Sequence, residues 1–308
     1  MNHNVLQRIP PGARVAVIRL RSLGDCVLTT PALALLMQFR PDLQLGVVVE
    51  ERFAGVFEAS PDVASILPPT VSALARWKPD LALNLHGGST SSQLTFASRA
   101  RLRAGFEHFR FRALYNISIP KAQQILGVTR KVHTAEHLAS AVFFLGVPVQ
   151  EIPRAVLFPS QKPKSARRYY AVIHPIASAP DKTWPAGSFV AAAKFLKREL
   201  SLKPVFIAGP GESLTEFDQF DCVVCASLDE TKNLLAGASL FLGNDSGPAH
   251  MAAAFGLPTV VLFGASDPAI WGPWRTESQT LTAPDGINGI QVEQVTAALT
   301  SLHAGQTR

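Results

Sequence analysis

The segment 243–250 places a carboxylate, a hydroxyl and an imidazole close together, on Asp245, Ser246 and His250. An apolar run before it predicts a buried strand, and residues 251–255 predict the start of a helix. Ligands of open α/β sheets bind at such strand-to-helix turns, where the free N–H groups favour an anion. The small residues Gly243 and Gly247 would let a ligand approach the backbone. A capping turn that binds nothing is the alternative.

Three more predicted strand-to-helix turns carry reactive side chains. The first turn contains Ser22, Gly24 and Asp25, and the second contains Ser178 and Lys182. The third contains Gly209, Gly211 and Glu212. A lysine beside a helix start suits phosphate oxygens, whereas a glutamate suits ribose hydroxyls. None of these turns is a Walker loop or a complete dinucleotide fingerprint, but together they predict a nucleotide site in the second half of the chain.

Asp25 is the carboxylate that the first half contributes to this set. Its simplest chemical role is general base, taking a proton from an attacking hydroxyl. The alternative is a residue of the first helical turn that interacts with the helix dipole.

Apolar runs alternate with helical segments along both halves of the chain. This alternation predicts βαβ units and a parallel sheet in each half, with domains at 1–160 and 161–308 and a cleft between them. The proline-rich segment 151–165 is the predicted linker. The predicted helix that follows the first strand begins at Thr30, with Pro31 in its first turn.

The first 160 residues are basic, with 17 Lys and Arg against 10 Asp and Glu, whereas the remainder is nearly neutral. Residues 99–131 hold eight of these basic residues, Arg110 and Arg112 among them, interleaved with aromatic side chains. Such a stretch suits an acidic glycan, anionic lipid headgroups or nucleic acid, or it is a solvated basic face. No nucleic-acid-binding motif accompanies it.

Three cysteines are too few for a disulfide framework, and the N-terminal residues lack the apolar core of a signal peptide. We therefore expect a cytoplasmic protein, free or peripheral on the cytoplasmic face of the inner membrane. His133 and His137 match an H-x-x-E-H zinc pattern without an obvious third ligand, so a structural helix is favoured there. No metal is expected.

Three motifs resemble glycosyltransferase family 9, the ADP-heptose:lipopolysaccharide heptosyltransferases. They are Arg-Leu-Arg-Ser-Leu-Gly-Asp at 19–25, Asp-Lys-Thr-Trp-Pro at 181–185, and Gly-Asn-Asp-Ser-Gly-Pro-Ala-His at 243–250. The resemblance implies a GT-B architecture, in which two Rossmann-like domains with parallel sheets face each other across a cleft. It also implies a metal-independent, inverting transfer of heptose from ADP-heptose to the lipopolysaccharide inner core.

The resemblance also implies residue roles. Asp25 matches the catalytic base, and Arg110 and Arg112 lie in the acceptor-binding domain, which would take an acidic glycolipid. The positions implied for the nucleotide-sugar donor are Ser22, Gly24, Ser178, Lys182, Glu212, Asp245, Ser246, Gly247 and His250.

Two positions depart from the family pattern. Ala177 replaces a second hydroxyl residue, and His86-Gly-Gly replaces the more usual Gln-Gly. These departures leave open a transferase for another nucleotide sugar or acceptor. A non-catalytic module that binds anionic glycans is an alternative of a different class.

Overall fold

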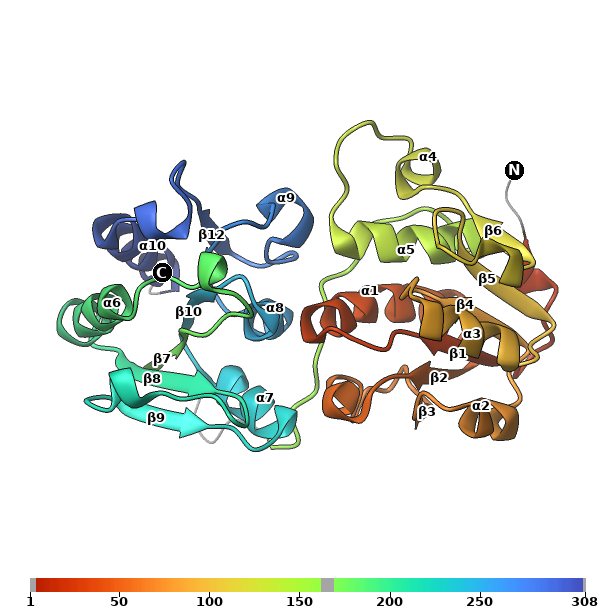
Figure 1. Cartoon of the computed structure of the whole chain (residues 1–308), viewed down its shortest axis with the longest axis horizontal. Helices are drawn as coiled ribbons and strands as arrows, with labels where there is room; N and C mark the ends of the chain where they lie inside the picture. Colours follow the sequence, from red (N-terminus) through yellow and green to blue (C-terminus); the bar gives the residue numbers. More distant parts are fainter. Residues whose placement is uncertain (1–3, 162–168, 307–308) are drawn as a thin grey trace. The chain divides into compact units, whose positions relative to one another are not determined.

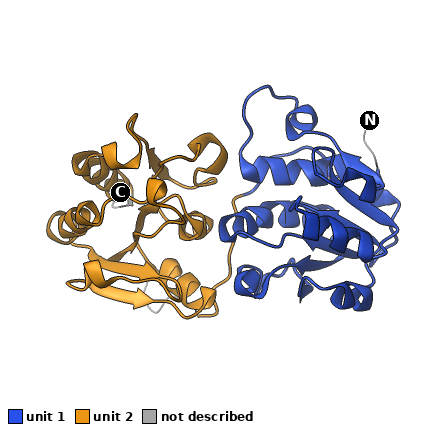
Figure 2. Cartoon of the chain, viewed as in Figure 1, with its two compact units in different colours: residues 1–153 blue, residues 154–308 orange. Residues whose placement is uncertain are grey.

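The computed structural model describes residues 4–161 and 169–306, and the chain divides into two compact units, Met1–Pro153 and Arg154–Arg308 (Figure 2). Each unit contains one six-stranded sheet whose described strand pairs are all parallel (Figure 1). The predicted α/β architecture is therefore confirmed for both halves. The predicted linker, 151–165, lies partly outside the described residues.

The strands of the first unit are β1 Arg14–Ile18, β2 Gln44–Val48, β3 Ser65–Leu67, β4 Leu81–Asn84, β5 Leu102–Phe106 and β6 Ile117–Ile119. Its helices are α1 Leu23–Phe39, α2 Val71–Trp77, α3 Ser89–Ala97, α4 Ala122–Leu126 and α5 Thr134–Leu145, with 3₁₀ turns η1 Val5–Gln7, η2 Glu51–Val56 and η3 Arg112–Leu114. The spatial order β3-β2-β1-β4-β5-β6 reverses direction between β1 and β4. This reversal is the switch point at which ligands of doubly wound sheets bind.

The second unit repeats this plan. Its strands are β7 Tyr170–His174, β8 Lys203–Ala208, β9 Asp221–Val224, β10 Leu240–Asn244, β11 Thr259–Leu262 and β12 Ser278–Leu281. Its helices are α6 Ala186–Glu199, α7 Leu228–Gly237, α8 Gly247–Ala254, α9 Pro268–Trp271 and α10 Val292–Gln306, with 3₁₀ turns η4 Pro180–Lys182, η5 Thr215–Phe217 and η6 Ile287–Gly289. The order β12-β11-β10-β7-β8-β9 places the switch point between β7 and β10.

The central strands are apolar on both faces because helices cover both faces of a doubly wound sheet. Residues 15–18 of β1 and 240–242 of β10 are fully buried. Trp184 and Phe189 pack edge to face beneath the second sheet, where they anchor the loop that follows β7. Each switch point therefore rests on a rigid core.

Helix α1 begins seven residues earlier than predicted, at Leu23, and continues through Pro31. Pro31 has no N–H to donate to the carbonyl of Val27, and the hydroxyl of Thr30 donates to that oxygen instead, at 2.9 Å. This substitute hydrogen bond satisfies the acceptor that a proline leaves unpaired inside a helix. Asp25 consequently lies in the first turn of α1 rather than in a loop.

Within residues 4–161 and 169–306, no helix combines the length and apolar character that crossing a bilayer requires.

Candidate active site

The loop that follows β7 is fastened to the end of β10 by a buried asparagine. The side chain of Asn244 accepts a hydrogen bond from the Trp184 N–H at 3.1 Å and donates one to the Pro175 carbonyl at 2.8 Å. Gly264, just after β11, leaves room for the backbone carbonyl of Asp181, because a Cβ there would lie 2.0 Å from that oxygen. Residues 175–185 are thus held at the switch point of the second sheet.

This fastening brings Lys182 to Asp245. The Nζ of Lys182 lies 3.8 Å from Asp245 Oδ2, and the same oxygen accepts a hydrogen bond from the Ser266 hydroxyl. The Asp245 side chain is 11% exposed, whereas that of Lys182 is 30% exposed. The Lys182 ammonium group is therefore partly accessible to solvent, whereas the Asp245 carboxylate that balances its charge is nearly buried.

The segment 243–250 enters helix α8 earlier than predicted. Ser246 is the N-cap, and α8 begins at Gly247 with Pro248 in its first turn, where a missing N–H has no cost. His250 therefore lies within the helix and is buried, rather than standing at an open rim. Ser246 and Gly247 stand at the helix N-terminus beside Asp245, as expected for an anion site.

A second histidine, His174, lies at the end of β7 with its Nδ1 3.1 Å from the Ser246 hydroxyl. Burial lowers the pKa of His174 to about 4. The imidazole is therefore neutral at pH 7 and supports the N-cap of α8 through a hydrogen bond rather than through charge.

This lowered pKa predicts a loss of stability in acid. Above pH 6.5 the imidazole is neutral in both the folded and the unfolded chain. Between about pH 6.5 and 4, the imidazole is protonated in the unfolded chain but not in the folded chain. The free energy of unfolding therefore decreases by about 1.4 kcal/mol for each pH unit in this range. Urea unfolding, followed by tryptophan fluorescence, should show a shallower pH dependence for His174→Asn; identical slopes would contradict this prediction.

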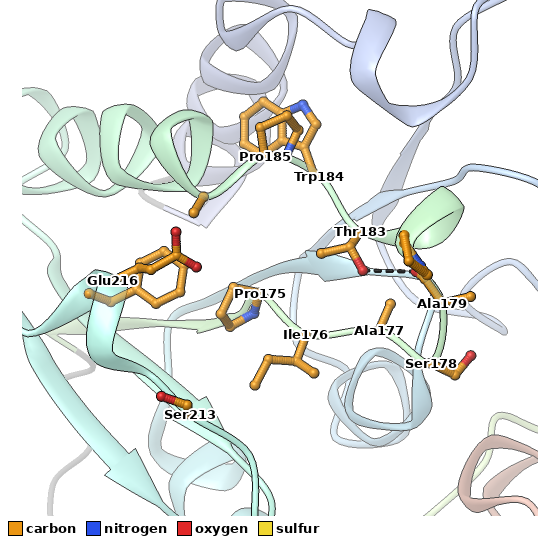
Figure 3. A pocket seen from close by; sticks show the side chains of 13 residues that line it. Pro175, Ile176, Ala177, Ser178, Ala179, Thr183, Trp184, Pro185, Ser213 and Glu216 are labelled. Carbon is orange, nitrogen blue, oxygen red and sulfur yellow. Dashed lines mark hydrogen bonds between the residues drawn. The ribbon is translucent and has the colours of Figure 1, made fainter.

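A pocket of about 540 Å³ lies between the loop after β7 and the turn η5 (Figure 3). Ser178 contributes to its lining, and Ser213 and Glu216 line the side opposite Ser178 in Figure 3. Glu212 does not line this pocket; its Oε2 accepts a hydrogen bond from the N–H of Gly209 at 2.6 Å. Glu212 thus braces its own turn and keeps its second carboxylate oxygen for another donor.

Asp25 lies at the switch point of the first sheet and is paired with a buried arginine. Arg19 Nη1 lies 3.4 Å from Asp25 Oδ1, and the Arg19 side chain is 7% exposed. Burial lowers the pKa of Arg19, and the Asp25 carboxylate opposes that shift. Asp25 Oδ2 accepts hydrogen bonds from the Ser22 N–H at 3.3 Å and from the Ser22 hydroxyl at 3.0 Å. The carboxylate is therefore held in one orientation.

The contacts of Asp25 match the alternative role, that of a residue in the first helical turn, and its role as general base stays a prediction. The capping interaction with Ser22 makes Asp25 part of the α1 N-terminus, and the Arg19 ion pair adds a charge that no capping role requires. Gly24 is buried in the same helical turn. Ser22 and Gly24 thus lie with Asp25 in the first unit, whereas the other residues predicted to bind the donor lie in the second.

Three histidines surround this ion pair or pack nearby. Burial lowers the pKa of His86, His108 and His137, that of His137 to about 4, and the charge of Arg19 adds to the effect at His86 and His137. His137 stacks on Phe106 with ring centroids 4.1 Å apart. These three imidazoles are therefore neutral at pH 7 and add no positive charge near Asp25.

The N-terminus of α5 contains the H-x-x-E-H pattern. His133 caps the helix by accepting from the Ala135 N–H at 3.1 Å, and Glu136 forms an ion pair with Arg130. These are structural contacts, as favoured from the sequence. In the part of the chain that the structure describes, no group of three or more His, Cys, Asp or Glu side chains is placed to hold a metal ion.

Arg110 and Arg112 are exposed in the segment between β5 and β6. The Arg110 guanidinium lies 5.5 Å from the ring centre of Phe111, whose side chain is also partly exposed. This segment therefore presents cationic and aromatic groups to solvent together.

Three residues that shape the two switch points were not singled out from the sequence: Arg19, His174 and Asn244. All three are polar residues at the ends of buried apolar strands. A buried polar side chain needs a hydrogen-bond or charge partner. A polar residue at the end of a predicted buried strand was therefore the signal that could have indicated these three positions.

The comparisons with known proteins agree on one family. The model of glycosyltransferase family 9 (heptosyltransferase) matches residues 71–296. Lipopolysaccharide heptosyltransferase 3 of Escherichia coli is 26% identical over 86% of this chain and 88% of its own length. Lipopolysaccharide heptosyltransferase 1 of Salmonella typhimurium is 24% identical, over 88% and 95%.

Solved structures show the same fold. A glycosyl transferase family 9 protein from Veillonella parvula has a TM-score of 0.82 at 23% identity, covering 95% of this chain and 97% of its own. The E. coli heptosyltransferase WaaC with ADP has a TM-score of 0.77 at 18% identity, covering 94% and 99%.

Two doubly wound units, matched by these structures over nearly their whole length, show the GT-B fold. The family model spans well over half of the residues. The chain belongs to glycosyltransferase family 9. This membership leaves the hypothesis of a non-catalytic glycan-binding module without support.

Proposed function

We propose that this protein transfers a heptose from ADP-heptose to the inner core of lipopolysaccharide, with inversion at the anomeric carbon and without a metal ion. The observation that carries the proposal is the Lys182–Asp245 pair beside the N-terminus of α8, at the switch point of the second sheet. The names of the relatives, lipopolysaccharide heptosyltransferases, support the choice of substrates.

The second unit, in this proposal, binds the nucleotide sugar. Lys182 and the N–H groups at the start of α8 would neutralise the diphosphate, a task that a metal ion performs in other transferases. The Asp245 carboxylate can only accept hydrogen bonds, so it would orient Lys182 and bind a sugar hydroxyl rather than phosphate. Ser178 would contact a phosphate oxygen, and the free oxygen of Glu212 would accept from a ribose hydroxyl.

The first unit would bind the acceptor and supply the base. Asp25 takes the proton from an acceptor hydroxyl, whose oxygen bonds to the anomeric carbon of the heptose while the bond from that carbon to the diphosphate oxygen breaks. ADP leaves with the bonding electrons. Because the attack comes from the face opposite the leaving group, the anomeric configuration inverts.

The acceptor of this reaction is an acidic glycolipid at the cytoplasmic face of the inner membrane, which would bring the protein into peripheral contact with that membrane. Residues 99–131 offer the complementary charge, and we propose Arg110 and Arg112 as acceptor-binding residues.

Removing both charges, in Arg110→Ala with Arg112→Ala, should raise the KM for the acceptor about 10-fold, since exposed charge contacts each contribute about 1 kcal/mol or less. The effect should shrink at high salt, because the arginines are exposed. Arg76→Ala, an exposed arginine of α2, is the matched control. Equal KM values for the double variant and the control would contradict the assignment.

Calorimetry with ADP, UDP, GDP and CDP, with and without a chelator, tests the donor. The proposal predicts selective binding of ADP that persists when divalent ions are removed. Selective binding of another nucleotide would favour the alternative, a GT-B transferase that uses a different nucleotide sugar. Loss of ADP binding on chelation would overturn metal independence.

A further inference from the structure

Arg19, the first residue after β1, is an arginine that the fold buries beside Asp25. Its N–H donates to the Val48 carbonyl at 3.1 Å, so its backbone is fixed to the neighbouring strand β2. The Arg19 side chain is 7% exposed, and its Nε is buried without a hydrogen-bond partner among the described residues. A buried cation with an unsatisfied donor costs free energy. The presence of this arginine therefore calls for an explanation other than stability.

The two carboxylate oxygens of Asp25 have different partners. Oδ2 accepts two hydrogen bonds, from the Ser22 N–H at 3.3 Å and from the Ser22 hydroxyl at 3.0 Å. Oδ1 lies 3.4 Å from Arg19 Nη1 and, within the described residues, accepts no hydrogen bond. A carboxylate oxygen has two lone pairs, and both of those on Oδ2 are used. Oδ1 is therefore the oxygen that can still take a proton.

Solvent reaches the carboxylate of this pair more readily than the guanidinium. The Asp25 side chain is 20% exposed, against 7% for Arg19. A substrate hydroxyl would thus approach Asp25, and Arg19 would act through the carboxylate rather than on the substrate itself. The capping interaction of Asp25 needs Ser22 alone, so it does not account for the arginine.

We propose that Arg19 is a positioning residue that, together with Ser22, fixes the Asp25 carboxylate so that Oδ1 is the base. This inference rests on the proposed glycosyl transfer. Oδ1 takes the proton of the acceptor hydroxyl while that oxygen bonds to the anomeric carbon, and ADP leaves with the electron pair of the broken bond. Ser22 holds one oxygen, so loss of Arg19 would let the carboxylate turn about its Cβ–Cγ bond.

Arg19→Met removes the charge but keeps an unbranched apolar chain that suits a buried position. We expect the kcat for heptose transfer to fall about 10²-fold, the loss that misplaced reacting groups cause. The KM for the acceptor and the affinity for ADP should not change, because Arg19 binds neither. Arg19→Lys keeps a charge for this single, non-bidentate contact, so its kcat should stay within about 10-fold of the wild type.

A double-mutant cycle with Asp25→Asn distinguishes positioning from a structural role. If Arg19 acts through Asp25, adding Arg19→Met to Asp25→Asn should lower the residual kcat by less than about 2-fold. Equal losses with and without the Asp25 carboxylate would overturn the proposal. Arg14→Met, which changes an exposed arginine at the other end of β1, is the control and should keep full activity.

Far-UV circular dichroism and urea unfolding show whether each variant is folded. If Arg19→Met does not fold, Arg19→Gln, which is polar and also lacks the charge, replaces it in the cycle. A folded variant without this charge that keeps the wild-type kcat would also overturn the proposal. A wild-type protein that transfers another sugar would refute the proposed donor instead, and the same cycle on that reaction would still test Arg19. A wild-type protein with no transferase activity would overturn both.

Discussion

Replacing Asp25 with asparagine should lower kcat by about 10²–10⁴ while the affinity for ADP stays the same. The amide has the size of the carboxylate but cannot take the proton of the acceptor hydroxyl. ADP binding is expected to survive because Ser178, Lys182 and Glu212, the residues proposed to contact the phosphates and the ribose, lie in the other unit. Transfer assays at saturating donor and acceptor, with calorimetry for ADP, measure the two quantities.

Asparagine is the better substitution because its amide oxygen can still accept a hydrogen bond from the buried guanidinium of Arg19, whereas alanine would leave that guanidinium with neither a charge partner nor an acceptor. Breaking a buried ion pair from one side costs about 3–5 kcal/mol, so an inactive alanine variant could simply be unfolded. Glu58→Gln, an exposed carboxylate of the same unit, is the control and should keep full activity. Weakened ADP binding as the main defect of Asp25→Asn would refute the base assignment.

Lys182→Met should reduce kcat/KM for the donor by about 10²–10³-fold and weaken ADP binding. Methionine keeps the aliphatic stem but removes the cation that we expect to offset the negative charge developing on the departing diphosphate. It also leaves Asp245 without its counter-ion, 11% exposed and close to the phosphates. The loss of binding affinity should be larger for ADP than for adenosine, because adenosine carries no phosphate.

Lys194→Met is the matched control, since Lys194 is an exposed lysine of α6 in the same unit. Calorimetry with ADP and adenosine, together with initial rates at varied donor, separates loss of phosphate recognition from loss of the fold. Equal losses for ADP and adenosine would mean that Lys182 supports the loop rather than the diphosphate.

The strand-to-helix turns could be predicted because local patterns define them. Apolar runs such as β1 and β10 are bounded by Gly, Ser and Asp, so the turn that contains Asp25 and the turn at residues 243–250 could be located from sequence. Boundaries were less accurate. Helix α1 continues through Pro31 only because the Thr30 hydroxyl replaces a backbone donor, which local propensity does not reveal.

Contacts between residues far apart in the sequence could not be predicted from the sequence pattern. Asn244 contacts Pro175, and His174 contacts Ser246, across 69 and 72 residues. These pairings depend on β10 lying beside β7, an order that the sequence pattern does not determine.

Heptosyl transfer itself is the most direct test of the central claim. The purified protein would be incubated with ADP-heptose and lipopolysaccharide that lacks inner-core heptose, with a chelator present, and the product examined by mass spectrometry and NMR. We predict the mass gain of one heptose, linked with the anomeric configuration opposite to that of the donor. Transfer from a different nucleotide sugar and none from ADP-heptose would contradict the account.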